Sequence, residues 1–550
     1  MTRANTAHQD RFALDNLPPP ESWPELVFDL PALQFPARLN CAVELLDKAI
    51  AEGHGDRPAI YSQYGTWTYA ELDRAANQVA HVLAEDCGLV PGNRVLLRSA
   101  NNPMLMACWF GVIKAGGIVV TTMPLLRAGE LVPIIDKAEI ALAISDIRLA
   151  DALETAMDKT PHLKRLLTYG EGSDPANALD QMMSAKPHDF SAVDTAADDV
   201  VLLGFTSGTT GQPKACMHFH RDVMAMHHCF NAEVLKPQQT DVFCGTPPIA
   251  FTFGLGASVV FPLAARATTA LIEKATPEEL IAAIGRYGVT NLFTAPTAYR
   301  AMLQHIDDYD TGSLRRCISA GEALPKATWE AWYNTTGIKI IDGLGSTEMI
   351  HIFISAADDE IKPGATGKAI PGYRATVLDE NDRPLPPGEV GRLAVKGPTG
   401  CRYLADDRQT KYVASGWNVT GDSYMQDEDG YFWFQARADD MIISSGYNIA
   451  GPEVEGALMT HPAVQECAVV ASPDADRGNL VKAFIVLAPG HEGGPALIKD
   501  LQNHVKAEIA PYKYPRAIVF VDTLPKTQTG KIQRFVLRQQ EQEQAGALAS

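Results

Sequence analysis

The 550-residue chain alternates between helical and strand-like patterns from about residue 40 to about residue 350. A helical pattern over residues 41–53 is followed by an extended segment over 58–69, a second helical pattern over 71–88 and an apolar strand over 93–100. Strands separated by helices pair in parallel, because each crossover needs a helix-length connection. The alternation therefore predicts an α/β fold of helix-covered sheets. A chain of this length exceeds what one core supports, so we expect at least two domains.

The pattern of expected secondary structure changes after residue 364. Short strands with Gly and Pro turns over residues 364–436 predict a small antiparallel sheet or barrel-like subdomain. A separate α+β unit follows, with helical patterns over 452–459 and 495–509 and strands over 465–472, 481–488 and 517–521. The Gln/Glu/Ala-rich tail after Arg538 is expected to fray. We thus expect a large N-terminal domain that includes the barrel-like subdomain, and a small, mobile C-terminal domain.

Composition narrows the classes of partner. Apolar residues make up 46% and charged residues 21% of the chain, and the formal net charge of -19 argues against nucleic acid or an anionic membrane as partner. Nine cysteines without a CxxC pair or Cys/His ligand spacing favour reduced thiols over disulfides or zinc. The N-terminus lacks an apolar signal segment, which predicts a cytoplasmic location. The oligomeric state stays open between monomer and homodimer.

Two apolar stretches, 103–126 and 242–265, have the length of a membrane span. Glycine interrupts the first, and several glycines and prolines interrupt the second. We therefore predict buried strand-turn-helix units at both places.

A small-residue loop follows the apolar strand pattern of residues 200–205. Seven of the nine residues from Thr206 to Lys214 are Gly, Ser, Thr or Lys. Glycines let backbone N–H groups turn toward an anion, hydroxyls add donors, and Lys214 adds positive charge. The loop lacks the Gly-Lys-Ser/Thr order of a Walker A loop. Phosphate binding is favoured over a plain surface turn, and the residues concerned are Thr206, Ser207, Gly208, Thr209, Thr210, Gly211 and Lys214.

This loop resembles the phosphate loop of the adenylate-forming superfamily, which includes acyl-CoA synthetases, nonribosomal adenylation domains and luciferases. Five further segments match that superfamily in the same order along nearly the whole chain. They are SAGEALP (319–325), DGLGSTE (342–348), GWNVTGD (416–422), RADDMIISSGYNIAGPEVE (437–455) and PKTQTGKIQR (525–534).

The resemblance implies an ATP site with a bound Mg²⁺. Glu348 would hold the metal beside the triphosphate, since carboxylate oxygen is a hard ligand; the alternative is an acid at a helix N-terminus. Asp422 would accept both ribose hydroxyls, although an Asp after Gly also suits a plain turn. Arg437 would contact ribose and phosphate. The remaining nucleotide contacts implied are Gly321, Glu322, Asp342, Gly343 and Thr347.

The resemblance also implies two half-reactions and a domain rotation. Lys531 would bridge the substrate carboxylate and the α-phosphate during adenylate formation, whereas taken alone it would be a surface lysine. Asp439 would be the hinge between domains 1–438 and 439–550, where a few backbone dihedrals absorb the rotation. The rotation would then bring Gly446 to a narrow channel for the thiol of coenzyme A.

The acid substrate would lie between two segments that line the acyl pocket in the family. These contribute Phe251, Thr252, Phe253, His351 and Ile352. Two aromatic rings and an isoleucine favour a flat apolar ring, with Thr252 and His351 as polar contacts, although core packing explains both equally well. The chain most resembles benzoate and 2-aminobenzoate CoA ligases. Thr252 stands where a small Ala is expected in benzoate ligases, which favours an ortho-substituted acid, 2-aminobenzoate.

Alternatives to this function stay open. Benzoate or another small aryl or alicyclic acid is an alternative substrate. Only 19 residues follow Lys531, so free coenzyme A is favoured as acceptor over a fused carrier domain, with a stand-alone enzyme that charges a separate carrier protein as the rival. A nucleotide-binding scaffold without activity is disfavoured, because the loop, Glu348, Asp422 and Lys531 are all present.

Overall fold

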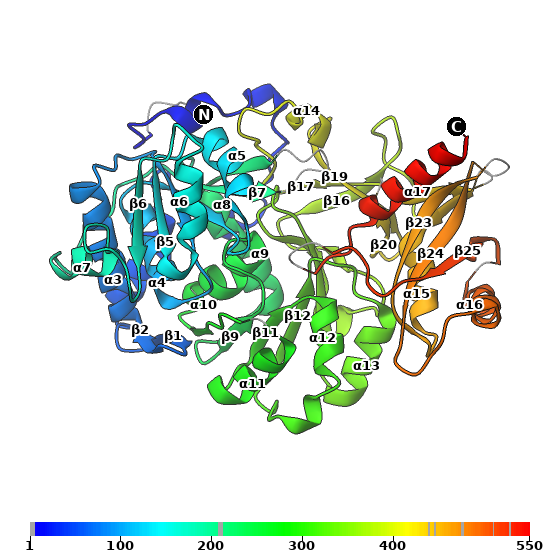
Figure 1. Ribbon diagram of the computed structural model, residues 1–550. Helices are drawn as coiled ribbons and strands as arrows, with labels where there is room; N and C mark the ends of the chain where they lie inside the picture. Colours follow the sequence, from blue (N-terminus) through cyan, green and yellow to red (C-terminus); the bar gives the residue numbers. More distant parts are fainter. Residues whose placement is uncertain are drawn as a thin grey trace. The chain divides into compact units, whose positions relative to one another are not determined.

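Mostly parallel strands build the two largest sheets of the protein (Figure 1). The computed structural model describes residues 6–206, 213–274, 276–437, 440–444, 447–474, 478–509, 511–526 and 530–549. The chain divides into two compact units. The first comprises residues 1–324, 328–375 and 395–418, and the second comprises residues 325–327, 376–394 and 419–550. The expected hinge residue, Asp439, lies outside the described residues.

The nine-stranded sheet has a parallel centre and antiparallel edges. Its order is β15 (Lys368–Ala369), β14 (Ile352–Ser355), β13 (Ile340–Gly345), β12 (Arg316–Ala320), β11 (Asn291–Thr294), β9 (Val242–Gly245), β10 (Thr268–Ala270), β1 (Pro58–Ser62) and β2 (Gly65–Thr68).

The six-stranded sheet is parallel except for its last strand, which forms a hairpin. Its order is β6 (Arg165–Tyr169), β5 (Leu142–Asp146), β3 (Arg94–Arg98), β4 (Ile118–Thr122), β7 (Val200–Thr206) and β8 (Lys214–Phe219). The strands β3, β4 and β5 are buried along their whole length, as expected for strands covered on both faces. The α/β fold predicted from the alternation is confirmed.

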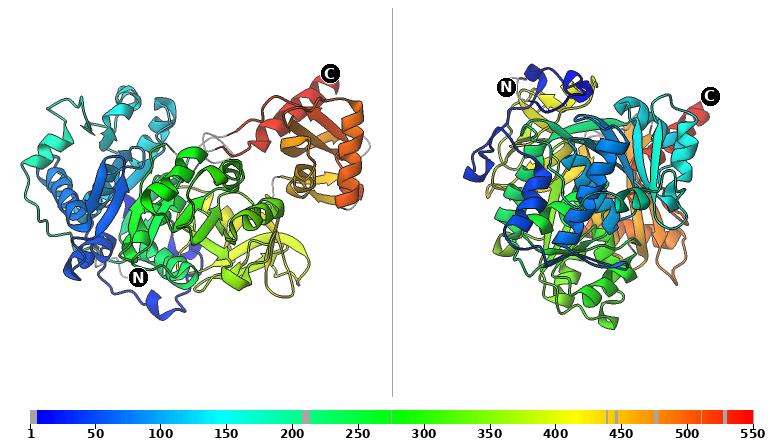
Figure 2. Two further views of the ribbon diagram at one scale, coloured as in Figure 1. Left: turned by 90° about the horizontal axis from the view of Figure 1, so that it is seen from below. Right: turned by 90° about the vertical axis from the view of Figure 1, so that its left-hand side faces the viewer.

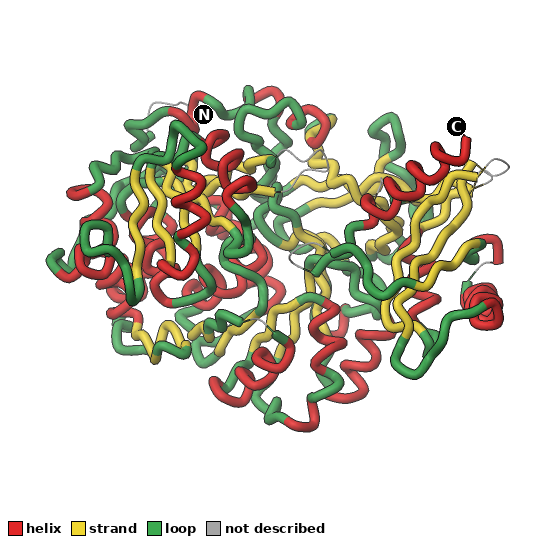
Figure 3. Tube along the Cα trace, viewed as in Figure 1, coloured by secondary structure: helices red, strands yellow, loops and turns green. Residues whose placement is uncertain are grey.

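Helices connect these strands and begin at residues suited to the position. Thr68 and Glu71 form a reciprocal capping box at the start of α3, and Asn102 caps α4 through the N–H of Leu105. Figure 3 shows the helices around the strands of this unit. They are α1 (Phe12–Asp15), α2 (Lys48–Ala51), α3 (Tyr69–His81), α4 (Pro103–Lys114), α5 (Ala128–Ala138), α6 (Asp151–Met157), α7 (Leu179–Ser184), α8 (His220–Met226), α9 (Thr252–Leu255), α10 (Phe261–Ala264), α11 (Pro277–Tyr287), α12 (Pro296–Met302), α13 (Lys326–Thr336) and α14 (Gln409–Tyr412).

The two long apolar stretches are strand and helix units, as predicted. Residues 103–126 contain α4 and β4, and residues 242–265 contain β9, α9 and α10. In the part of the chain that the structure describes, every helix is too short or too polar to cross a membrane.

The region after residue 364 forms a third, five-stranded sheet. Its path is β16 (Arg374–Leu378), β17 (Val390–Lys396), β19 (Trp417–Gln426) and β18 (Val413–Ala414), and β20 (Phe432–Arg437) pairs with β19. A hairpin of β21 (Met441–Ser444) and β22 (Tyr447–Ala450) comes next along the chain. Of the two architectures expected here, the structure has the sheet.

The C-terminal part is the α+β unit that the sequence predicts. Its sheet holds β23 (Val464–Asp474), β24 (Gly478–Leu487) and β25 (Ala517–Phe520), and its helices are α15 (Gly451–Met459), α16 (Pro495–Glu508) and α17 (Arg534–Ala549). Alternate residues of β23 face opposite sides: Val469 belongs to the same apolar cluster as Leu501 of α16, and Val470 belongs to the same cluster as Leu537 of α17. The left view of Figure 2 shows these two helices, α16 in orange and α17 in red, on opposite sides of the strands of this sheet.

The expectation of a frayed tail after Arg538 is wrong. Residues 534–549 form α17, and the Glu541 side chain on it is only 5% exposed. Glu541 accepts hydrogen bonds from Lys482 at 2.7 and 2.8 Å and from Ser472 at 2.6 Å. The composition of the tail resembles a disordered segment, but these contacts to β23 and β24 hold the helix in place.

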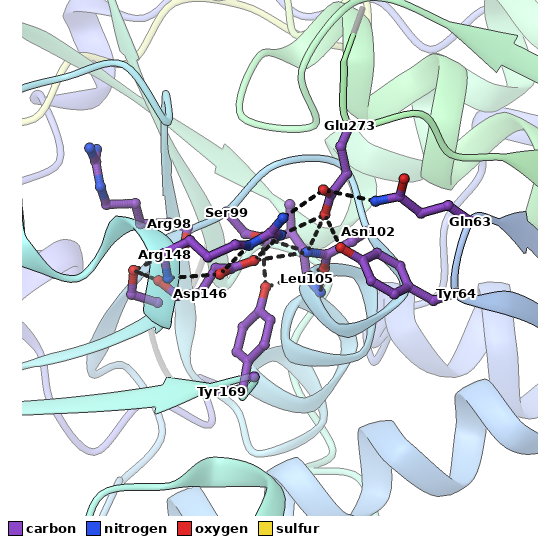
Figure 4. Close-up of polar contacts among 12 residues, drawn as sticks. Gln63, Tyr64, Arg98, Ser99, Asn102, Leu105, Asp146, Arg148, Tyr169 and Glu273 are labelled. Carbon is purple, nitrogen blue, oxygen red and sulfur yellow. Dashed lines mark hydrogen bonds and ion pairs between the residues drawn. The ribbon is translucent and has the colours of Figure 1, made fainter. Parts of the chain in front are cut away.

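A polar network joins the six-stranded sheet to the nine-stranded sheet (Figure 4). Arg148 follows β5 and pairs with Asp146 at its end and with Glu273, which follows β10. Asn102 donates to Glu273 at 3.2 Å, and Tyr64 does so at 3.0 Å. Burial alone would raise the pKa of Glu273, but the hydrogen bonds from Arg148, Asn102 and Tyr64 together hold that pKa below its ordinary value.

Glu273→Gln tests this network. The variant removes the carboxylate that binds Arg148, Asn102 and Tyr64. At neutral pH we therefore expect an apparent Tm a few degrees lower than that of the wild type, measured by scanning fluorimetry. Because the folded pKa of Glu273 is lowered, its stabilisation exists above the ordinary pKa and is lost as the pH falls; the gap to the wild type should therefore narrow below about pH 4.

Glu85→Gln serves as the matched control, since this side chain is 52% exposed and pairs with Lys186. It should leave Tm nearly unchanged. Equal effects of the two substitutions would contradict a special role for the Glu273 network.

Candidate active site

The β7–β8 hairpin carries the expected phosphate loop. Thr206 ends β7 and is the register partner of Lys214, which begins β8. The residues Ser207, Gly208, Thr209, Thr210 and Gly211 lie outside the described residues. The two ends of the loop are thus held side by side by the pairing of β7 with the edge strand β8, with Lys214 aligned opposite Thr206.

Close packing brings the turn after β13 against β7. A Cβ atom on Gly204 would lie 2.7 Å from Thr347 Cγ2, so only glycine allows this approach. The turn is stabilised by the Met349 N–H, which donates to Ser346 Oγ at 3.3 Å. Residues 346–350 form a turn and a bend, which rules out the alternative of Glu348 as an acid at a helix N-terminus.

Three side chains meet beside the ends of the loop. The Tyr403 hydroxyl donates to Glu348 Oε1 at 2.5 Å and accepts from Lys214 Nζ at 2.9 Å. Lys214 Nζ lies 3.4 Å from the same carboxylate oxygen. Glu348 is 7% exposed and Tyr403 is 1% exposed, so the cluster is shielded from water. Sequence reasoning identified Lys214 and Glu348 but missed Tyr403, which lies in an irregular segment without periodic or motif signal.

The cluster has the chemistry of a metal and phosphate site. A shielded carboxylate supplies the hard oxygen that Mg²⁺ prefers, and the adjacent ammonium supplies charge for phosphate oxygens. Burial and the neighbouring Glu348 carboxylate raise the pKa of Tyr403 well above its ordinary value, so its hydroxyl stays protonated and donates to Glu348.

The expected adenine contacts lie on neighbouring strands of the nine-stranded sheet. The register pairs Ser319 with Asp342 and Ala320 with Gly343, and Gly321 and Glu322 follow directly. Gly321 has a φ of 91°, a conformation that favours glycine. Burial raises the pKa of Asp342 to about 8, against the opposing effects of the Gly343 N–H and the Ser319 hydroxyl.

Two of the expected acyl-pocket residues, Phe253 and His351, belong to an aromatic cluster. The His351 ring lies 5.8 Å from that of Phe253 and 4.6 Å from that of Phe261, and Phe230 lies 5.5 Å away. A Cβ on Gly256 would come within 2.5 Å of His351 Nε2, so this glycine leaves room for the imidazole.

Exposure differs among these five residues. Thr252, His351 and Ile352 are buried at 9%, 3% and 2% exposure, whereas Phe251 and Phe253 are half-buried. Burial lowers the pKa of His351 to about 3, with a small opposing effect from the backbone of Phe253, so the ring is uncharged. Within the described residues, neither ring nitrogen makes a hydrogen bond of normal geometry, and the backbone of Phe253 is the polar group that acts on the ring.

The remaining expected residues belong to the second unit. Asp422 on β19 is the register partner of Arg437 on β20. The Asp422 N–H donates to Thr420 Oγ1 at 3.3 Å. Lys531 is exposed and lies between Gly530, whose φ is 85°, and Ile532, which bridges to Lys526. Asp439 and Gly446 lie outside the described residues.

Comparisons with known proteins show the family to which the chain belongs. A family model described as AMP-binding enzyme matches residues 47–403, and one described as AMP-binding enzyme C-terminal domain matches residues 453–531. The chain belongs to the AMP-binding enzyme family. The resemblance to the adenylate-forming superfamily is thereby confirmed.

Members of the family with similar chains are acid–CoA ligases. The benzoate–CoA ligase of Thauera aromatica is 35% identical over 514 residues, covering 92% of this chain and 97% of that protein. A crystal structure of the anthranilate CoA ligase AuaEII in complex with anthranoyl-AMP has a TM-score of 0.90 and 33% identity, covering 94% of this chain and all of that one. A benzoate CoA ligase from Burkholderia xenovorans has a TM-score of 0.83 and 31% identity, covering 91% and 100%.

This AMP-binding enzyme is therefore an AMP-forming acid–thiol ligase, as the sequence predicted. ATP and coenzyme A are the co-substrates of the class. The chain was expected to have a large N-terminal part and a small C-terminal part. Its relatives have the same two parts.

The raised pKa of Asp342 predicts a pH-dependent stability. Because the folded protein holds this proton more tightly than the unfolded chain, Asp342 lowers stability increasingly as the pH rises from about 4 to about 8. Asp342→Asn should consequently raise the Tm of the ligand-free enzyme relative to wild type, by an amount that grows over this range.

Scanning fluorimetry over pH 4–9 measures the difference. Asp359→Asn is the control, because it removes a negative charge from an exposed carboxylate that pairs with Lys339. A Tm difference for Asp342→Asn that does not change with pH would contradict the buried, protonated carboxyl.

Proposed function

We propose that the protein converts a small aromatic carboxylic acid to its coenzyme A thioester at the expense of ATP, and that 2-aminobenzoate is its preferred acid. The observation that carries the finer assignment is the uncharged His351 imidazole, enclosed by phenylalanine rings and without a hydrogen bond of normal geometry within the described residues. Flat apolar walls suit an aromatic ring, and a few polar groups fix its orientation.

An ortho amino group would satisfy the imidazole. An enclosed polar atom without a partner costs about 1–3 kcal/mol, so a ligand that hydrogen-bonds to His351 gains affinity over one that does not. The amino group of 2-aminobenzoate is a donor, and an uncharged imidazole has one acceptor nitrogen. Thr252, buried at the start of α9, offers a second polar contact where an alanine would offer none.

The chemistry proceeds in two steps. In the first, a carboxylate oxygen attacks the α-phosphorus of ATP and pyrophosphate leaves; in the second, the thiolate of coenzyme A attacks the acyl carbon and AMP leaves. Glu348 would hold Mg²⁺, which neutralises phosphate charge. Lys214 would contact the phosphate oxygens, and Asp422 with Arg437 would hold the ribose. Lys531 would stabilise the negative charge of the first transition state.

Domain rotation separates the two steps in this proposal. Asp439 would be the hinge of domains 1–438 and 439–550, and Gly446 would line the channel for the thiol. Ser207, Gly208, Thr209, Thr210 and Gly211 would surround the triphosphate together with Thr206. The adenine would lie beside Gly321, Glu322, Asp342 and Gly343, with Thr347 in the adjoining turn.

A substrate panel tests the acid. The panel compares 2-aminobenzoate with benzoate, hydroxybenzoates and medium-chain acids. The kcat/KM for pyrophosphate release should be highest with 2-aminobenzoate. His351→Phe should reduce the preference for 2-aminobenzoate over benzoate about tenfold, because the variant removes only the polar partner. Thr252→Val, which keeps the side-chain shape, measures the contribution of the hydroxyl separately.

No preference for 2-aminobenzoate over benzoate in the wild type would refute the finer assignment and leave benzoate or another small aryl acid as substrate. The acceptor is tested with the same acid, by comparing thioester formation on coenzyme A with that on a holo-carrier protein. Exclusive transfer to the carrier would replace the ligase proposal with a stand-alone adenylation enzyme.

Lys531→Ala tests the division into two half-reactions. The variant should lose most adenylate formation, measured as pyrophosphate release, because positive charge is lost from the first transition state. Thioester formation from supplied acyl-adenylate should be largely retained. Lys526→Ala is the control: it removes a lysine that lies five positions before Lys531 and pairs with Glu466. This variant should keep both activities. Equal loss of both half-reactions in Lys531→Ala would contradict the proposal.

A further inference from the structure

Tyr403 is the one member of the Lys214–Glu348–Tyr403 cluster to which no role could be assigned from the sequence. Its segment runs alongside β8: the Met217 N–H donates to the Arg402 carbonyl at 2.7 Å, and the Leu404 N–H donates to the Ala215 carbonyl at 2.9 Å. Residues 402–404 thus extend the six-stranded sheet beyond the strand that begins with Lys214.

Two further anchors fix the backbone of Tyr403. Gln409 Oε1 accepts from the Tyr403 N–H at 2.9 Å, while Gln409 Nε2 donates to the Cys401 carbonyl at 3.0 Å. The adjacent Arg402 is fully buried and forms an ion pair with the equally buried Asp222 of α8. Moving the segment would separate this ion pair and leave uncompensated buried charges. The ion pair therefore strongly resists displacement of the segment.

The hydroxyl group of this anchored ring lies between the two charged groups of the site. It donates to Glu348 Oε1 and accepts from Lys214 Nζ, so both charges are held by one neutral, fixed group. The Lys214 ammonium also lies 4.9 Å from the centre of the Tyr403 ring. Glu348 itself lies on a turn and not within a helix or strand. A carboxylate on a turn needs a hydrogen-bond partner such as Tyr403 to keep one orientation.

We propose that Tyr403 is a positioning residue for adenylate formation, which holds the Glu348 carboxylate and the Lys214 ammonium in the arrangement that receives magnesium and the ATP phosphates. The inference rests on the proposed function of Glu348 and Lys214 and adds a residue that acts through them. Its effect falls on the first half-reaction, because pyrophosphate has left before the thiol attacks.

Tyr403→Phe removes the hydroxyl and keeps the ring. We expect kcat/KM for ATP in pyrophosphate release to fall roughly tenfold to a hundredfold, the range for hydrogen bonds to charged groups. The Mg²⁺ concentration that gives half-maximal rate should rise, because Glu348 loses its fixed orientation. Thioester formation from supplied acyl-adenylate should keep its wild-type rate.

Tyr412→Phe is the matched control. The Tyr412 ring packs edge-on against Tyr403 with centroids 5.9 Å apart, and its hydroxyl lies 3.3 Å from Ser346 Oγ. The control therefore deletes a neighbouring tyrosine hydroxyl in the same aromatic pair. It should leave the Mg²⁺ dependence unchanged.

A readout without turnover complements the kinetics. The rise in Tm that Mg²⁺ and ATP cause together, relative to ATP with EDTA, should shrink in Tyr403→Phe and persist in Tyr412→Phe. Equal loss of both half-reactions with an unchanged Mg²⁺ dependence would overturn the proposal in favour of a purely structural tyrosine, as would wild-type behaviour of Tyr403→Phe. Failure of the wild type to activate any aromatic acid would instead refute the proposed substrate class, since these assays use whichever acid the wild type accepts.

Discussion

The approach of Thr347 to Gly204 is the contact on which the candidate site depends. Gly204 belongs to the six-stranded sheet, and Thr347 belongs to the turn after β13 of the nine-stranded sheet. A side chain on Gly204 would push the turn outward, and Glu348 would move with it. Because the contact is close, the lysine at the start of β8 and the glutamate on the turn after β13 come within 3.4 Å of each other.

Burial then sets the chemistry of the groups brought together. Glu348 is shielded from water, so its charge needs the partners that Tyr403 and Lys214 provide. In the aromatic cluster burial has the opposite consequence: it removes the charge of His351 by lowering its pKa to about 3, and leaves a neutral imidazole. One part of the first unit is thus organised around paired charges, and another around a neutral apolar surface.

Much of the fold could be predicted because hydrophobic periodicity and helix-length spacing are local properties. The strands β3, β7, β23 and β24, and the helices α3, α15 and α16, all lie where the pattern indicated them. The tail after Arg538 was predicted wrongly, since its polar composition carries no sign of the Lys482 and Ser472 side chains that meet Glu541. Irregular segments could not be predicted in this way, because they have neither a hydrophobic periodicity nor helix-capping residues.

The sequence by itself determined the α/β class and the superfamily, because each is encoded in residues that are neighbours along the chain. Only the tertiary structure decided that Tyr403 joins Glu348, from which it is 55 residues distant, and that phenylalanine rings enclose His351. Such meetings depend on sheet order and strand register. These are set by the packing of the whole core, so no local pattern of residues records them.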